Sequence, residues 1–196
     1  MKPLIHSTFV VLMLVALASL SVAGSFEEGL QAYAAGDLKQ AFQIWRIEAE
    51  QGAPAAQNNL GFMLENGLGV LKDDKQAAQW YRLAAEQGNA VAQNNLGTMY
   101  ASGRGVAQDY QEAAKWYHLS AEQGYADAHV NLGILYFEGS GVLQSYEDAY
   151  ACWVVAAAKG LEIARKNMEI GQKQMDPKQI ETAQHRAEEI LARLDD

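Results

Sequence analysis

The sequence predicts an all-α protein: a right-handed superhelical α-solenoid of stacked antiparallel helix pairs with a C-terminal helical cap. The first observation is an internal repeat, because the block Ala-x-x-Asn-Leu-Gly begins at Ala56, Ala92 and Ala128, every 36 residues. The second is a recurring set of glycines that divides each unit into two segments of helical length. A repeat of this size cannot bury its apolar face alone, so stacked neighbours must build a continuous core.

The first 23 residues have the pattern of a secretory signal. Lys2 supplies a positive start, residues 9–18 are an unbroken apolar run, and Ser21-Val22-Ala23 places small residues where signal peptidase cleaves. The apolar run is much shorter than the about 20 residues needed to span a bilayer. We therefore expect residues 1–23 to be removed and no stable membrane insertion after cleavage. An uncleaved anchor is the alternative.

Residues 24–52 form a shorter N-terminal helix pair. Gly29 and Ala41 correspond to Gly61 and Ala77 of the following unit. The spacing is 12 residues in the first unit and 16 in the second. The N-terminal pair therefore lacks four residues in the connection between its two helices.

Three complete repeats follow, at residues 53–88, 89–124 and 125–160. In the first of them, an apolar stripe at helical spacing predicts a helix over 54–65. Gly67 begins a turn, and Asp73 can cap the second helix by accepting hydrogen bonds from its free backbone N–H groups. That helix is expected to end near Gln87, with Gly88 just beyond its end.

One glycine falls inside the first helix of each repeat; these glycines are Gly61, Gly97 and Gly133. A glycine in a helix interior costs about 1 kcal/mol relative to alanine. Its recurrence in three copies predicts that the paired helix crosses too closely for a Cβ to fit.

Residues 161–196 are expected to form capping helices. A helix is predicted over 161–173, and Asp176 followed by Pro177 is typical of a helix start. The last helix, ending near Leu194, is charged on one side and apolar on the other, as a terminal unit of a stacked array must be.

The repeat resembles the Sel1-like repeat family, which is related to tetratricopeptide repeats. The family pattern A-x-x-N-L-G-x-M-Y-x-x-G-x-G-V is present from Ala92 to Val106. It continues with Asp109, Ala113 and Trp116-Tyr117, followed by the closing Ala-Glu-Gln-Gly. The third copy departs from it, with Cys152-Trp153 in place of Trp-Tyr. The resemblance implies an adaptor or scaffold, commonly exported in bacteria, and implies that the N-terminal pair is closer to a plain tetratricopeptide repeat.

Neither the composition nor the motifs indicate nucleic-acid binding, metal binding or catalysis. The net charge of −9 argues against nucleic-acid binding, which needs clustered Lys and Arg. Cys152 is the only cysteine, so no intramolecular disulfide can form, and the most economical interpretation is a small buried core residue. The mature chain has three histidines, none with a histidine or cysteine three or four residues away. We expect no metal, no cofactor and no catalytic residue.

One enzymatic alternative stays open at this point. The resemblance includes an exported, cysteine-rich subgroup linked to β-lactam or cell-wall hydrolysis, whose repeats each carry a cysteine pair. The single cysteine of this chain counts against that subgroup.

Candidate partner-binding residues are the positions of the first helices that differ between repeats. Three columns, spaced i, i+4 and i+7, share one helix face, and packing between repeats does not dictate their identity. In related repeats this face lines the concave groove. The candidates are Asn58, Phe62, Glu65, Asn94, Thr98, Ala101, Val130, Ile134 and Phe137.

These observations predict a periplasmic or secreted, non-catalytic protein. We expect it to be a monomer that binds a protein or peptide partner, itself an envelope or secreted protein, in the concave groove. The apolar side chains that the third repeat contributes to the groove could instead be covered by the C-terminal helices.

Overall fold

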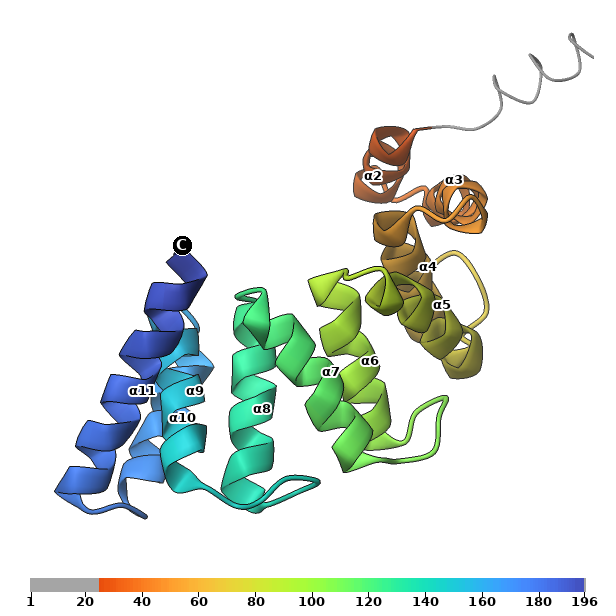
Figure 1. Cartoon of the computed structure of the whole chain (residues 1–196). Helices are drawn as coiled ribbons and strands as arrows, with labels where there is room; N and C mark the ends of the chain where they lie inside the picture. The colour runs from red at the N-terminus through yellow and green to blue at the C-terminus, as the bar shows by residue number, and fades with distance from the viewer. Residues whose placement is uncertain (1–24, 196) are drawn as a thin grey trace, which may run out of the picture.

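The computed structural model describes residues 25–195, all of the regular structure of which is helical. The predicted signal segment, 1–23, lies outside the described residues. Within residues 25–195, ten helices lie in a curved array (Figure 1): the first eight form four consecutive pairs, and the last two both pack against the eighth. In chain order they are α2 (Phe26–Ala34), α3 (Leu38–Glu50), α4 (Pro54–Asn66), α5 (Asp74–Glu86), α6 (Ala90–Ser102), α7 (Tyr110–Glu122), α8 (Ala126–Glu138), α9 (Tyr146–Ala158), α10 (Glu162–Gln172) and α11 (Pro177–Asp195).

The predicted helix pairs are confirmed, with ends within a residue or two of the expected positions. Three residues separate α2 from α3 and seven separate α4 from α5, which accounts for the shorter N-terminal unit. Asp73 caps α5 by accepting hydrogen bonds from the backbone N–H groups of Lys75 and Gln76, at 3.0 and 2.9 Å. Asp109 and Ser145 cap α7 and α9 in the same way.

The repeated columns build the core. The alanine, leucine and methionine columns of the first helices are at most 4% exposed in all three repeats. Their members are Ala56, Ala92, Ala128, Leu60, Leu96, Leu132, Met63, Met99 and Leu135. Of the paired aromatic positions, Tyr81 and Tyr117 are buried, whereas Trp80 and Trp116 are only partly buried.

The helical glycines lie against an aromatic ring of the paired helix. A Cβ at Gly61 or Gly97 would stand 2.8 Å from the ring of Tyr81 or Tyr117, and one at Gly133 would overlap the indole of Trp153. Such distances are shorter than any relaxed carbon–carbon contact. The expected lack of room for a Cβ is confirmed, and at all three positions the nearest atoms belong to a side chain rather than to the crossing backbone.

The second glycine of each inter-helix loop has a role beyond its turn. A Cβ at Gly105 would overlap the Asp74 carbonyl at the start of α5, one unit earlier in the array. Gly69 and Gly141 lie in the same way against Leu38 and Tyr110, each at the first turn of the preceding unit's second helix. Each loop is therefore seated on its neighbour, which helps to fix the stacking between units.

The C-terminal cap departs from the repeat geometry. Ala164 of α10 packs with Val130 and Trp153, whereas α11 packs on α9. Leu83 of α5 and Leu119 of α7 are 44% and 43% exposed, but Val155, the equivalent residue of α9, is fully buried. Helix α11 therefore covers a face of α9 that the earlier second helices leave open. Within the described chain, no helix is long and apolar enough to span a bilayer.

Candidate functional site

The predicted groove face is only partly exposed. Phe62 on α4 and Ile134 on α8 are 41% and 37% exposed, and Thr98 occupies the equivalent position of α6, half-buried. The Thr98 hydroxyl donates a hydrogen bond to the Asn94 carbonyl at 3.0 Å and accepts one from the Tyr117 hydroxyl at 3.1 Å. We call Phe62, Thr98 and Ile134 the groove row; it contains the two exposed side chains of the predicted face, Phe62 and Ile134.

The second column of the predicted face contains Asn58, Asn94 and Val130. Its two asparagines form hydrogen bonds between neighbouring repeats. The Asn58 side-chain oxygen accepts a hydrogen bond from Asn95 at 3.1 Å, and that of Asn94 accepts one from Asn131 at 2.9 Å. Asn94 and Val130 are each 7% exposed, and Val130 belongs to the core at the third repeat. A partner cannot reach these two side chains, so the prediction does not hold for them as accessible contacts.

The column Glu65, Ala101 and Phe137 also has internal partners. Glu65 accepts a hydrogen bond from the Tyr81 hydroxyl and forms an ion pair with Arg104, both at 2.7 Å. Burial and the Glu65 carboxylate raise the pKa of the Tyr81 hydroxyl. Phe137 packs against the ring of Trp153, with ring centroids 5.7 Å apart.

The other contacts of Ala101 and Phe137 are each with residues of the same repeat. Phe137 also packs on Tyr146, and Ala101 is half-buried with its carbonyl accepting a hydrogen bond from Gln108. The column therefore ties the first helix of each repeat to its loop and second helix. The helices that follow do not close over the whole apolar patch of the third repeat, because Ile134 stays exposed.

A buried glutamine on the other side of each first helix joins neighbouring units. The Gln57 amide donates to the Ala49 carbonyl, and the Gln93 amide donates to the Ala85 carbonyl, both at 3.1 Å. The side-chain oxygen of Gln93 accepts a second hydrogen bond, at 2.7 Å, from Gln123 at the end of the paired helix. Gln57 is held by Gln87 in the same way. We call this arrangement the glutamine interlock.

The third repeat lacks this interlock. His129 stands at the position of Gln93, and Lys159 stands at that of Gln123. His129 is 3% exposed, and neither ring nitrogen has a hydrogen-bond partner within residues 25–195. Burial, reinforced by the nearby Lys159 and His118, lowers its pKa to about 4, although the Ala121 backbone favours the protonated ring. The ring is therefore neutral at pH 7.

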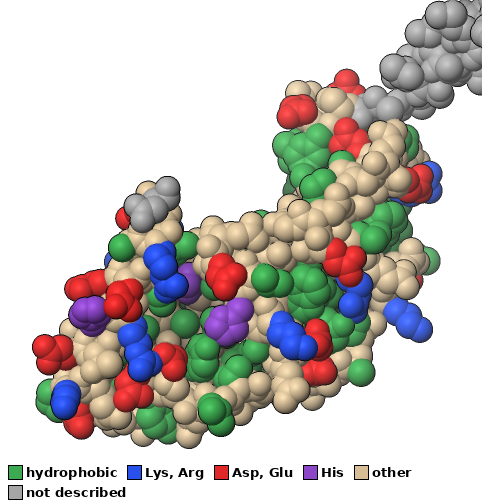
Figure 2. Space-filling view, viewed as in Figure 1, with side chains coloured by type: hydrophobic (Ala, Val, Ile, Leu, Met, Phe, Trp, Pro, Cys, Tyr) green, Lys and Arg blue, Asp and Glu red, His purple; other side chains and the backbone are tan. Residues whose placement is uncertain are grey.

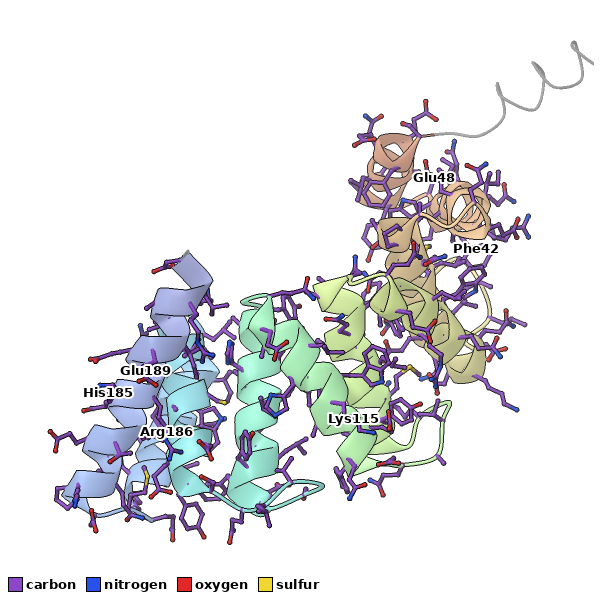
Figure 3. The ribbon with its side chains drawn as sticks, viewed as in Figure 1. Phe42, Glu48, Lys115, His185, Arg186 and Glu189 are labelled. Atoms are coloured by element: carbon purple, nitrogen blue, oxygen red, sulfur yellow. The ribbon has the colours of Figure 1, made fainter. Side chains whose placement is uncertain are left out.

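A cavity of about 530 Å³ opens beside His129, between α7, α8, α9 and α11. Figure 2 shows this face of the molecule hollowed between α11 and α7, with histidine and charged side chains around the hollow. Arg186 reaches from α11 to an ion pair with Asp148 on α9 (Figure 3), which closes one side. The cavity lies where His129 takes the place of the interlock glutamine and where α11 packs against α9.

Neither the thiol nor the metal-ligating side chains of the described residues support a hydrolase at this cavity. Cys152 lies in its wall but is 5% exposed, and burial raises the pKa of its thiol to about 12, so no thiolate forms at neutral pH. No cluster of three or more His, Cys, Asp or Glu side chains in the described part of the chain could hold a metal ion.

Sequence reasoning found the groove row but missed this cavity. The signal was present, because the columns Gln57, Gln93, His129 and Gln87, Gln123, Lys159 change together in the third repeat. Their significance depends on a contact between residues 30 positions apart, which only the structure shows.

Comparison with known proteins agrees with the repeat. The Sel1 repeat model matches residues 54–89, 90–125 and 126–161, more than half of the chain. No match was found among curated proteins. Among solved structures, c5321 of uropathogenic Escherichia coli, a protective antigen displaying an SLR fold, is 35% identical over 79% of this chain, with a TM-score of 0.75.

Two further structures share the architecture. A Sel1 repeat protein from Oxalobacter formigenes is 38% identical over 74% of this chain, with a TM-score of 0.70. Cysteine-rich protein B of Helicobacter pylori has a TM-score of 0.53 over 66% of this chain and 93% of its own, and at 23% identity this likeness concerns the fold alone. The chain spans 33% of the Escherichia coli protein and 60% of the Oxalobacter protein. With three matched repeats and helix pairs stacked as in these structures, the chain belongs to the Sel1 repeat family.

Proposed function

We propose that this protein is a non-catalytic scaffold of the bacterial cell envelope, periplasmic or secreted, that binds a protein partner through the groove row. Sel1 repeats are in general protein-interaction scaffolds. The observation that carries the choice of surface is the exposure of Phe62, an aromatic side chain 41% exposed on a helix whose other large apolar side chains, Leu60, Met63 and Leu64, are buried. Aromatic side chains are the commonest anchors of protein interfaces.

The composition of the row supports binding rather than packing. Equivalent positions hold Phe62, Thr98 and Ile134, whereas the core columns beside them hardly vary. A position that serves only the stacking of repeats would face the same surroundings in each copy and would hold similar side chains. The differences give each repeat its own contact, which an extended repeat surface can use to select one partner.

Export is supported by the sequence of residues 1–23. If the signal is cleaved, intact-mass measurement of protein recovered from the envelope fraction should correspond to a chain beginning at Gly24. A mass that includes the apolar run would identify an anchored protein instead. The c5321 likeness is compatible with an exposed location, since that protein is described as a protective antigen.

The binding role is tested by capture from an envelope extract on the purified mature chain. Phe62→Ala and Ile134→Asp should each lose the captured partner while melting within about 2 °C of the wild type, since half-exposed side chains contribute little to stability. The matched control is Gln79→Ala on α5, an exposed position on a second helix, which should retain the partner. Equal capture by all four proteins would contradict the proposed surface.

The hydrolase alternative has no support in the site, because the one cysteine is buried and held as the thiol. A β-lactam hydrolysis assay on the purified chain should give no turnover above the buffer rate.

A further inference from the structure

The cavity beside His129 lies at a position where the third repeat departs from the first two. In the first two repeats the same position is a glutamine whose amide donates to the preceding unit and whose side-chain oxygen accepts from the end of the second helix of its own repeat. In the third, the imidazole is buried and neither nitrogen finds a partner among the described residues. A buried polar group without a partner destabilises the fold by about 1–3 kcal/mol, so such a group in a cavity wall points to an occupant.

Of the buried polar side chains of the wall, His129 alone has no well-formed hydrogen bond within residues 25–195, although the Ala121 backbone lies close enough to favour its protonation. The Tyr136 hydroxyl and His118 Nε2 are hydrogen-bonded to each other at 3.1 Å, and Arg186 is paired with Asp148. The occupant therefore needs one polar group that can form a hydrogen bond with the buried His129 ring. A neutral imidazole offers one N–H donor and one bare nitrogen acceptor, and a hydroxyl can pair with either because it both donates and accepts.

The rest of the cavity wall is suited to a ligand whose remaining surface is apolar. It is formed by Ala121, Leu132, Ala151, Cys152, Ile190 and Leu194. Next to them, His118 and Tyr136 present an edge-on aromatic pair with centroids 5.9 Å apart. Flat rings pack well against aliphatic side chains and against the edges of other rings. The volume of about 530 Å³ is within the range of small-molecule sites.

The charges around the cavity disfavour a strongly charged ligand. Glu122, Asp148 and Glu189 oppose Arg186 and Arg193, so the formal balance is −1 and no single sign dominates. An anion would approach three carboxylates, and a cation would approach two guanidinium groups. A neutral ligand avoids both penalties.

We propose that this cavity binds a phenolic ring, with its hydroxyl hydrogen-bonded to His129 and its ring against the apolar wall. The phenol has two possible sources, a free small phenol or the tyrosine side chain of a protein partner. The proposal concerns a site built by α7, α8, α9 and α11, which is separate from the groove row, so either can fail without the other.

The test measures binding of p-cresol to the mature chain, with toluene as the matched probe that lacks the hydroxyl. We expect p-cresol to bind about tenfold more tightly than toluene, the equivalent of one hydrogen bond, and to shift the ring nitrogen resonances of His129 in NMR spectra. The spectral readout uses the wild-type protein and needs no substitution.

The control is a double variant, His129→Gln with Lys159→Gln, which is designed to restore the glutamine interlock. It places at these two positions the residues that the second repeat has there. Its glutamines can pair with each other and with the Ala121 carbonyl, so it should fold and should lose p-cresol binding at least tenfold. N-acetyl-tyrosinamide and N-acetyl-phenylalaninamide distinguish the sources. Tighter binding of the tyrosine compound than of p-cresol indicates a partner's tyrosine, and its exclusion indicates a free phenol.

Three outcomes would overturn the proposal. They are equal binding of p-cresol and toluene, unchanged His129 resonances at saturating p-cresol, or full p-cresol binding by the restored variant. Each would mean that His129 is satisfied by water in a cavity without a phenol ligand.

Discussion

Gln123 donates a hydrogen bond of 2.7 Å to the buried side chain of Gln93, 30 residues earlier in the chain. Gln93 in turn donates to the carbonyl of Ala85 in the preceding repeat. One side chain thus connects both helices of its own repeat to the neighbouring unit. The same arrangement at Gln57 shows that it belongs to the repeat, and its absence at His129 marks the position where the repeat was modified.

The interlock should contribute measurably to stability. Gln93→Met keeps the volume of the side chain but leaves the Gln123 amide without its acceptor and removes the bond to Ala85. We expect the free energy of unfolding in urea to fall by about 1–3 kcal/mol. Gln123→Ala, at an exposed position, should have a smaller effect. An unchanged urea midpoint for Gln93→Met would show that the interlock only accompanies the packing.

Gly97 should tolerate no side chain. A Cβ there would lie 2.8 Å from the Tyr117 ring and 3.2 Å from the Ala113 carbonyl. Gly97→Leu should therefore destabilise the protein by about 1–3 kcal/mol through overpacking, and Gly97→Ala by less. Helix propensity alone would make the alanine variant more stable than the wild type. Thermal melts of both variants decide between the two effects.

The ring of Tyr117 provides the control for that prediction. On a Tyr117→Leu background the nearest obstacle is gone, so Gly97→Ala should be less damaging than in the wild type, as measured in a double-mutant cycle. Purely additive effects would mean that the glycine is required for another reason.

Much of the fold could be predicted from the sequence because the repeat imposes the same surroundings three times. Identical surroundings require identical residues, so the columns of Ala56, Leu60 and Met63 identified the core, and Asp73 and Gly67 identified helix ends. The position of α11 could not be predicted this way. It docks on α9 because Ala151 and Val155 replace Lys115 and Leu119 of α7, a difference that the repeat does not explain.

The candidate site was predicted only in part, for a related reason. Variation between repeats distinguished the candidate columns from the invariant core columns, but variation has several causes. Val130 varies because Trp153 and Ala164 pack against it, and Asn94 is held by Asn131 of the next repeat. Only Phe62 and Ile134 combine variation with substantial exposure. Exposure depends on neighbours distant in the sequence and has no local pattern.

Lowering the pH should reduce the free energy of unfolding, because His129 is held neutral in the folded state. Its pKa is about 4 in the folded state and 6.5 for an ordinary histidine, so between these values the unfolded chain binds the proton and the folded chain does not. Stability from this group is complete above about pH 6.5 and is lost as the pH falls. Between pH 7 and pH 5 the loss is about 2 kcal/mol.

Urea unfolding at the two pH values measures this loss. His129→Gln removes the titrating group, so its stability should fall about 2 kcal/mol less than that of the wild type over the same interval. If both proteins lose the same stability, other groups such as His118, whose pKa burial also lowers, account for the acid sensitivity.

The contact of α11 with α9 should be separable from the rest of the array. Ala187 is fully buried against Ala151 and Val155, so Ala187→Asp places a charge in that contact and should release α11. Amide hydrogen exchange over residues 177–195 should become rapid, while α4 to α7 keep their protection. The exposed neighbour variant Glu188→Ala should leave exchange unchanged. Persistent protection of α11 in Ala187→Asp would show that other contacts hold it.

The most direct test of the binding proposal uses a photo-reactive benzophenone amino acid incorporated in living cells at position 62, 134 or 79. If the groove row is the binding surface, irradiation should yield one adduct of the same mass from positions 62 and 134 and none from position 79. Adducts from position 79 alone, or no adduct from positions 62 and 134 in protein that is exported and folded, would contradict the account.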